Sequence, residues 1–137
     1  MTIIGFNVTK ILVQKKSVQK GKISVNNNVS LSSVEYSDLK LDPTKTSLTF
    51  KFQFTSRYDP NIADIIIDGE VLTLEEKEAG TKIVEGWEKT KRLSKDVVTP
   101  ILNNVLVKCN VLSILLSREV NLPPPIPLPK VGTQTKT

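Results

Sequence analysis

Three acidic side chains, Asp64, Asp68 and Glu70, are the clearest candidates for a cation site. Their even spacing puts them on one face of an extended strand, where carboxylates could share a hard cation. Such alternation is more often the solvated face of an antiparallel sheet, and we favour that interpretation. The sequence contains no His, which excludes imidazole catalysis, hydrolase triads that need His, and zinc sites of four Cys and His ligands. We therefore expect no metal.

The single cysteine, Cys109, is a candidate nucleophile. It lies among apolar residues with no nearby base to lower its pKa, which favours a buried, inert thiol. One cysteine cannot form an internal disulfide, so we expect a reducing, cytoplasmic location. The six glycines are scattered and form no phosphate-binding loop. The sequence therefore predicts a protein that is not an enzyme and uses no cofactor.

Lysines near the N-terminus account for the whole net charge of +5. Residues 1–34 contain no acid and five bases, namely Lys10, Lys15, Lys16, Lys20 and Lys22. This basic segment could attract nucleic acid or acidic protein segments. It could equally be a solvated turn between strands, because lysines also discourage edge-to-edge pairing. No aromatic residue or Arg is interleaved with the lysines, so we favour the turn.

Two apolar features are candidates for binding a polypeptide. Trp87 lies on the apolar stripe of a predicted helix, which is typical of a core position but could also be a ligand platform. The segment 121–131 holds five of the eight prolines and should run as polyproline II. It could be a ligand for a proline-binding groove, or a rigid strap that packs on the surface through Ile126 and Leu128. We favour the strap because no basic residue is well placed beside the prolines.

The first half of the chain alternates with a period of two and predicts strands near residues 2–13, 22–34, 46–58 and 62–74. The clearest is the third, where four large apolar residues, Leu48, Phe50, Phe52 and Phe54, alternate with polar ones. We expect one face of the first strand to carry Ile4, Phe6, Val8 and Leu12. The second should present Ile23, Val25, Val29 and Leu31, with a bulge or weak spot at 26–28.

Beyond residue 74 the apolar spacing becomes helical and predicts helices near 76–91 and 95–120. Ser94 is a suitable cap for the second helix, although Thr99 could be the cap with Pro100 at the first helical position. From Ile101 to Val120 the helix is apolar on nearly all faces. Its interior Asn and Lys residues argue against a membrane span, so we expect protein to cover it. A homodimer or dimer of dimers through Leu112 and Leu116 would do so.

These elements define an α+β fold, in which a four-stranded antiparallel sheet is followed by two helices on one face. We expect a single domain over residues 1–131 and a loose C-terminal tail at 132–137.

The order of elements is similar to that of the SecB-like export chaperones. The matching residues are the strand segment Ile67-Asp68-Gly69-Glu70-Val71 and the helix that runs from Pro100 through Cys109 and Ser113–Arg118 into Leu122-Pro123 and Pro125-Ile126-Pro127. The chain resembles in particular short archaeal-type SecB-like proteins without the terminal helix.

The resemblance implies oligomers and the binding of unfolded polypeptide in apolar grooves. We therefore expect a nucleotide-independent holdase, with a non-enzymatic adaptor or nucleic-acid-binding module that uses Lys10–Lys22 as the alternative.

Overall fold

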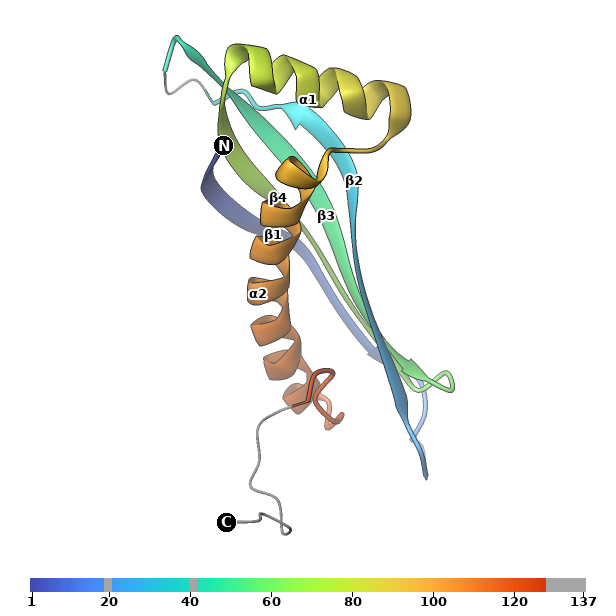
Figure 1. Ribbon diagram of the computed structural model, residues 1–137. Helices are drawn as coiled ribbons and strands as arrows, with labels where there is room; N and C mark the ends of the chain where they lie inside the picture. The colour runs from blue at the N-terminus through green and yellow to red at the C-terminus, as the bar shows by residue number, and fades with distance from the viewer. Residues whose placement is uncertain (19–20, 40–41, 128–137) are drawn as a thin grey trace, which may run out of the picture.

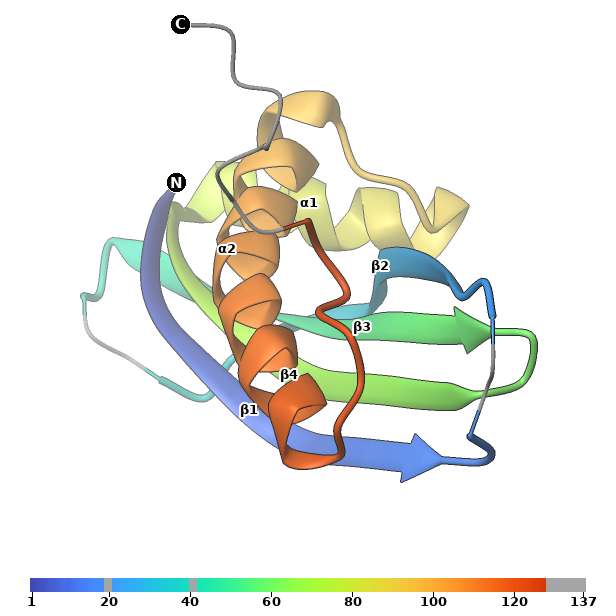
Figure 2. The same cartoon turned by 90° about the horizontal axis from the view of Figure 1, so that it is seen from below.

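The computed structural model describes residues 1–18, 21–39 and 42–127. Six elements follow one another: β1 (Thr2–Lys15), β2 (Ser24–Tyr36), β3 (Lys45–Asp59), β4 (Ala63–Glu76), α1 (Lys77–Thr90) and α2 (Lys95–Glu119). The strands form one antiparallel sheet in the order β1-β4-β3-β2, and both helices cover the same face (Figures 1 and 2). The predicted α+β class and the order of its elements are confirmed. The expected tail at 132–137 lies outside the described residues.

The strands β1 and β2 form opposite edges of the sheet, although they are consecutive in the chain. The chain therefore leaves β1 at one edge and enters β2 at the other, so the lysine-containing segment does not join paired strands by a tight turn (Figure 2). The consecutive strands β2 and β3 pair antiparallel, as do β3 and β4. The tight connection between β3 and β4 is closed by the Ile62 N–H donating to the Tyr58 carbonyl at 3.0 Å. Alternation alone identifies strands but not their neighbours, because the order of strands depends on tertiary packing.

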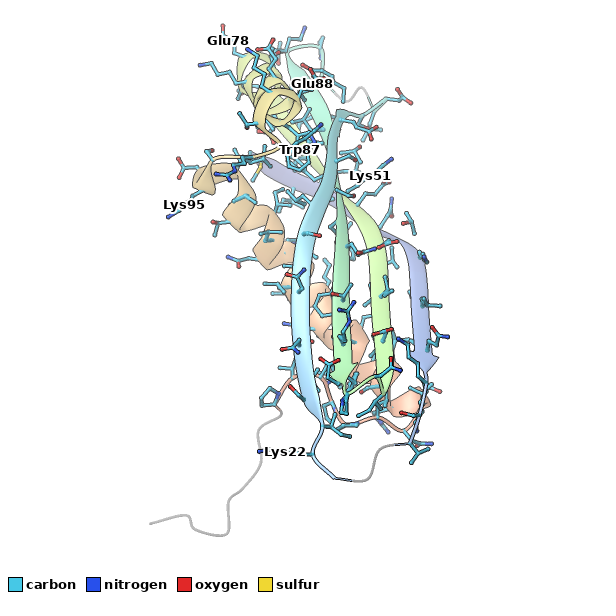
Figure 3. All side chains as sticks on the ribbon, turned by 90° about the vertical axis from the view of Figure 1, so that its right-hand side faces the viewer. Lys22, Lys51, Glu78, Trp87, Glu88 and Lys95 are labelled. Atoms are coloured by element: carbon cyan, nitrogen blue, oxygen red, sulfur yellow. The ribbon has the colours of Figure 1, made fainter. Side chains whose placement is uncertain are left out.

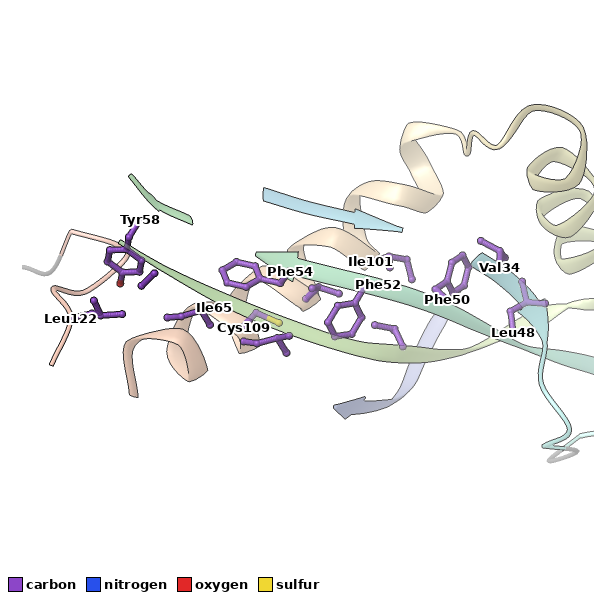
Figure 4. Close-up of a cluster of buried hydrophobic side chains, with 14 of the residues drawn as sticks. Val34, Leu48, Phe50, Phe52, Phe54, Tyr58, Ile65, Ile101, Cys109 and Leu122 are labelled. Carbon is purple, nitrogen blue, oxygen red and sulfur yellow. The ribbon is translucent and has the colours of Figure 1, made fainter. Parts of the chain in front are cut away.

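The core lies between the helix-facing side of the sheet, called here the inner face, and α2 (Figure 4). The alternation in β3 is confirmed, since its apolar residues on this face are fully buried, including Tyr58. From β4, Ile65, Ile67 and Val71 join them, while α2 contributes Ile101, Val105 and Cys109. Each large side chain that is fully buried here stabilises the fold by about 1.5–3 kcal/mol.

Irregularities in the edge strands change which residues face the core. In β1, register shifts occur between Ile3 and Gly5 and between Val8 and Lys10. The prediction for β1 is therefore partly wrong: Phe6 and Val8 face inward, but Ile4 lies within the first shift and Leu12 pairs with outward-facing Ile66. A bulge inserts an extra residue and so moves every later side chain to the other face.

In β2 the irregularity lies between Leu31 and Ser33, not at 26–28. Val25, Val29 and Leu31 face inward as expected, since their β3 partners are the buried Tyr58, Phe54 and Phe52. Asn27 occupies the position between the two valines without breaking the register. Its amide is held by hydrogen bonds, which lets a polar residue stand in an apolar row.

The helix α1 lies across the end of the sheet, where Gly80 is buried against the Thr46 side chain. It ends at Lys91, whose left-handed conformation (φ 56°) turns the chain toward α2. α2 begins after Ser94, whose carbonyl accepts hydrogen bonds from the N–H groups of Val97 and Val98. Because this first turn forms ahead of Pro100, the alternative start at Thr99 is wrong. α2 ends at Glu119. Two residues further on, Asn121 is another left-handed residue (φ 56°), and prolines follow.

Candidate functional site

A pocket of about 280 Å³ opens where α1, α2 and β2 meet, and we call it the Trp87 pocket. Trp87 is half-buried in its wall and lies at the junction of α1 with the sheet (Figure 3). The other apolar lining residues are Leu31, Leu93, Val98 and Leu102, while Lys91 and Arg92 add positive charge. The Lys91 ammonium lies 5.8 Å from the centroid of the indole ring, a cation–π contact. The pocket therefore suits an apolar or aromatic side chain, and because it is open it can accept side chains of different shapes.

The proline-rich segment Leu122–Pro127, called here the strap, returns from the end of α2 alongside that helix (Figure 2). The strap packs on the surface as predicted, since Leu122 and Pro125 are buried and Ile126 is half-buried. It does not run straight as polyproline II, because the chain bends at Pro125 and Ile126. Leu128, the other residue predicted to pack, lies outside the described residues.

Two side chains of the sheet hold the strap by its backbone. The Tyr58 hydroxyl donates to the Pro123 carbonyl at 2.5 Å, and the Asn27 amide nitrogen donates to the Pro125 carbonyl at 2.9 Å. The Ser56 hydroxyl in turn donates to the Asn27 amide oxygen at 2.6 Å and so fixes that amide. Burial raises the pKa of Tyr58 to about 12, while the Ser117 hydroxyl opposes the shift. The phenol therefore stays protonated, and a donor, throughout the neutral range.

The inward-facing row of β2, made of Val25, Asn27, Val29 and Leu31, links the strap to the Trp87 pocket. Leu31 lines the pocket, and Asn27 contacts the strap four residues away, which is about 13 Å along a strand. β2 is also an edge of the sheet, since it pairs only with β3 among the described strands. Trp87 and Ile126 were predicted together as peptide-binding residues. Trp87 lies beside Leu31 at one end of the row, and the strap that carries Ile126 contacts Asn27 further along it, so the two residues do not line one pocket.

The exposed side of α2 carries a second apolar surface. Val107, Val111 and Leu115 recur every four residues and are 67%, 59% and 52% exposed, and we call them the α2 stripe. The predicted interface residues Leu112 and Leu116 are half-buried against the core beside this stripe. Among the described residues, α2 alone is long and apolar enough to cross a membrane by length and composition, and 22% of its most apolar window is buried. Much of this helix is thus left uncovered in the single chain.

The described lysines of the basic segment do not form one open patch. Lys15 donates to the Val120 carbonyl at 3.0 Å on the inner face, and the Lys16 ammonium lies 2.9 Å from Asp64. Lys10 stands opposite Asp68 in the strand register, and Lys22 is exposed at the end of the sheet (Figure 3). Lys20 lies outside the described residues. Two of these four lysines are therefore engaged by the chain's own groups.

The candidate cation ligands lie on the outer face of the sheet, as expected for its solvated side. Asp64 is close to both Lys16 and Arg57, and Asp68 accepts a hydrogen bond from Gln53 at 2.9 Å. Within residues 1–18, 21–39 and 42–127, no group of three or more acids or thiols could hold a metal ion. Cys109 is fully buried, and burial raises its pKa to about 11, so the thiol is inert at neutral pH.

Sequence reasoning missed the pocket residues Leu93, Val98 and Leu102 and the strap-binding pair Asn27 and Tyr58. The sequence held one indication of the strap-binding pair. Polar groups at inward positions of a strand need hydrogen-bond partners, and Asn27, Ser56 and Tyr58 all occupy such positions. The pocket had no local signal, because it forms where α1 ends against β2.

No protein-family model matches the chain, and no curated protein is similar to it in sequence. Among solved structures it is similar to the Mycobacterium tuberculosis Rv1957 SecB-like chaperone, solved in complex with a ChAD peptide from the Rv1956 HigA1 antitoxin. The TM-score is 0.53 and the sequence identity 10%, and the match covers 96% of this chain and 87% of that chain. The chain therefore shares the fold of a SecB-like chaperone, and the likeness extends over nearly its whole length.

Proposed function

We propose that this protein is a chaperone-type binder of unfolded or extended polypeptide that works without nucleotide. The observation that carries the proposal is the Trp87 pocket, an open apolar cavity at the exposed β2 edge. Apolar side chains of an extended segment would enter the pocket, and its backbone would follow the row or edge of β2. The shared fold with a peptide-bound SecB-like chaperone supports the same class of partner.

The chemistry of the pocket favours broad specificity. Its walls are mostly Leu, Val and Trp, which bind through burial of apolar surface and not through directed hydrogen bonds. Lys91 and Arg92 favour acidic groups beside the apolar anchor. A cytoplasmic site of action is part of the same proposal and is supported by the lone, inert thiol.

We also propose that the protein forms homo-oligomers through the α2 stripe, with Leu112 and Leu116 at the border of the interface. A contiguous apolar helix face of this kind is typical of a protein–protein contact. A nucleic-acid-binding role receives no comparable support, since Lys15 and Lys16 already contact the chain's own groups.

Suppression of aggregation tests the proposal. The protein should reduce the light scattering of an unrelated denatured protein in nucleotide-free buffer. The variant Leu102→Asp, which places a charge in the Trp87 pocket, should lose this effect while keeping its circular dichroism spectrum. Val18→Asp is the matched control, because Val18 is 80% exposed and lies far from the pocket in the lysine-containing connection. Unchanged scattering with the parent protein, or equal activity of both variants, contradicts the proposal.

A further inference from the structure

We propose that Tyr58 and Asn27 form a binding subsite for proline-containing extended segments, and that the strap is its resident, displaceable occupant. The inference deepens the proposed function, on which it rests, because the subsite lies on the same β2 row as the Trp87 pocket.

The subsite is built to bind carbonyl groups. Tyr58 and Asn27 each donate one hydrogen bond to a strap carbonyl, and the Asn27 oxygen is already occupied by the Ser56 hydroxyl. Both strap carbonyls thus accept from donors on the sheet, whereas the Leu122 N–H at the start of the strap donates to the Ser117 carbonyl of α2 at 2.9 Å. The backbone of a proline has a carbonyl but no N–H. The two donors can therefore pair the carbonyls of a proline segment, and no N–H of that proline is left buried without a partner.

The spacing of the donors matches polyproline II. The two carbonyls that they bind are two residues apart, which is about 6 Å in a polyproline II segment with its rise of about 3.1 Å per residue. On β3, Tyr58 and Ser56 are also two residues apart, which is about 6.6 Å along a strand, and Asn27 pairs with Ser56 across the ladder. The strap meets both donors between Pro123 and Pro125 and then bends at Pro125 and Ile126, so an extended proline segment need match the sheet over these three residues only.

The strap advances toward the Trp87 pocket. Pro123 binds at the level of Tyr58, and Pro125 binds at the level of Ser56 and Asn27, one step nearer to Leu31. A polypeptide anchored at Leu31 and Trp87 that extends along the β2 row reaches Asn27 within about four residues and meets the strap there. Only one extended chain can use the two donors, so the strap and the polypeptide compete.

The experiment separates the strap from the subsite. In one variant the strap residues Pro123–Pro127 are replaced by Gly-Ser-Gly-Ser-Gly, which keeps the chain length and leaves Tyr58 and Asn27 intact. The probe is a fluorescein-labelled synthetic peptide, Asn-Leu-Pro-Pro-Pro-Ile-Pro, which is the strap sequence preceded by Asn121. Its binding is followed by fluorescence anisotropy. A tethered segment has a local concentration in the millimolar range, so the resident strap should exclude the peptide from the unmodified protein, and the replacement should strengthen binding at least about tenfold.

Two further arms test the chemistry. Tyr58→Phe in the strap-replaced protein should weaken peptide binding about fivefold, as expected for one lost hydrogen bond, whereas Tyr36→Phe, at an exposed tyrosine elsewhere on β2, should not. A peptide with alanine at every proline should bind more weakly than the parent. If the strap-replaced protein is folded but ignores the peptide, the subsite does not exist. If it also still suppresses aggregation, the proposed function survives while this inference fails.

Discussion

The variant Val111→Asp tests whether the α2 stripe holds copies of the chain together. Val111 lies at the centre of the stripe and is 59% exposed, between Val107 at 67% and Leu115 at 52%. Full burial of such a side chain is worth about 1.5–3 kcal/mol, so burying the exposed remainder contributes about 1–1.5 kcal/mol for each residue. Three residues on each of two helices then supply about 6–9 kcal/mol, comparable with the association cost of about 4–15 kcal/mol.

A dimer at micromolar concentration needs about 8 kcal/mol beyond this cost, so the half-buried Leu112 and Leu116 at the border must add buried area to that of the stripe. With so little surplus, the loss of one central stripe residue should separate the copies. Two aspartates at a symmetric interface remove the two valine contributions and bury two like charges, a loss of at least about 3 kcal/mol. Every 1.4 kcal/mol is about tenfold in affinity, so the dissociation constant should rise by more than about 100-fold. The unmodified protein should sediment as a dimer or larger at micromolar concentration, and the variant as a monomer with unchanged circular dichroism.

The neighbouring variant Leu112→Asp is the matched comparison. Leu112 is half-buried against the core, so this charge should lower the midpoint of urea unfolding instead of releasing folded monomers. A mass near 15.2 kDa for the unmodified protein at micromolar concentration refutes the reasoning. Partition of α2 into lipid vesicles in place of self-association would also contradict it, and vesicle flotation distinguishes that outcome.

Three further predictions concern the fold. Gly69→Ala should lower the free energy of unfolding in urea by several kcal/mol, because a Cβ there would collide with the Asn7 carbonyl and the Phe52 ring, whereas Gly86→Ala meets open space and should stabilise α1 by about 1 kcal/mol. The melting temperature should fall as the pH rises above 9.0, the ordinary pKa of Cys109, because the folded state favours the protonated forms of Cys109 and Tyr58. The fall should continue through their raised pKa values of about 11 for Cys109 and about 12 for Tyr58. Cys109→Ala should flatten the lower part of this decline, and a flat profile in the unmodified protein contradicts the prediction. Lys16→Ala should change the stability by less than about 1 kcal/mol, because its ion pair with Asp64 is partly exposed; a larger loss would mean that the pair is structural.

The sequence predicts those parts of this fold that follow from local periodicity. The alternation of Leu48, Phe50, Phe52 and Phe54 identifies β3 and its buried face, and the change of period after residue 74 locates both helices within one or two residues. The placement of β1 and β2 at opposite edges was not predictable, because strand pairing depends on contacts between distant segments. The second shift in β1 was missed because no Gly or Pro lies at Val8–Lys10 to indicate it, and the first was missed although Gly5 stands beside it.

The candidate site was predicted only in part, since it depends on tertiary packing. Trp87 was identified by its residue type and its spacing. Its pocket, however, also includes Leu31, which precedes it by 56 positions in the sequence, and Leu102 from the next helix. The strap was recognisable from its prolines. Its two hydrogen-bond donors were not, because Asn27 and Tyr58 are brought together only by the pairing of β2 with β3.

Trp87 is the only tryptophan, so its fluorescence reports on the candidate site alone and provides the most direct test of polypeptide binding. The titrant should be a permanently unfolded protein without tryptophan, such as reduced and carboxymethylated ribonuclease A, at low and high salt. We expect a saturable blue shift of the Trp87 emission, because a bound apolar side chain removes water from the half-exposed indole. The shift should survive high salt, unlike binding to a basic patch, and should disappear in Leu102→Asp. An emission spectrum that no unfolded chain changes, or a response abolished by salt and matched by single-stranded nucleic acid, would contradict the account.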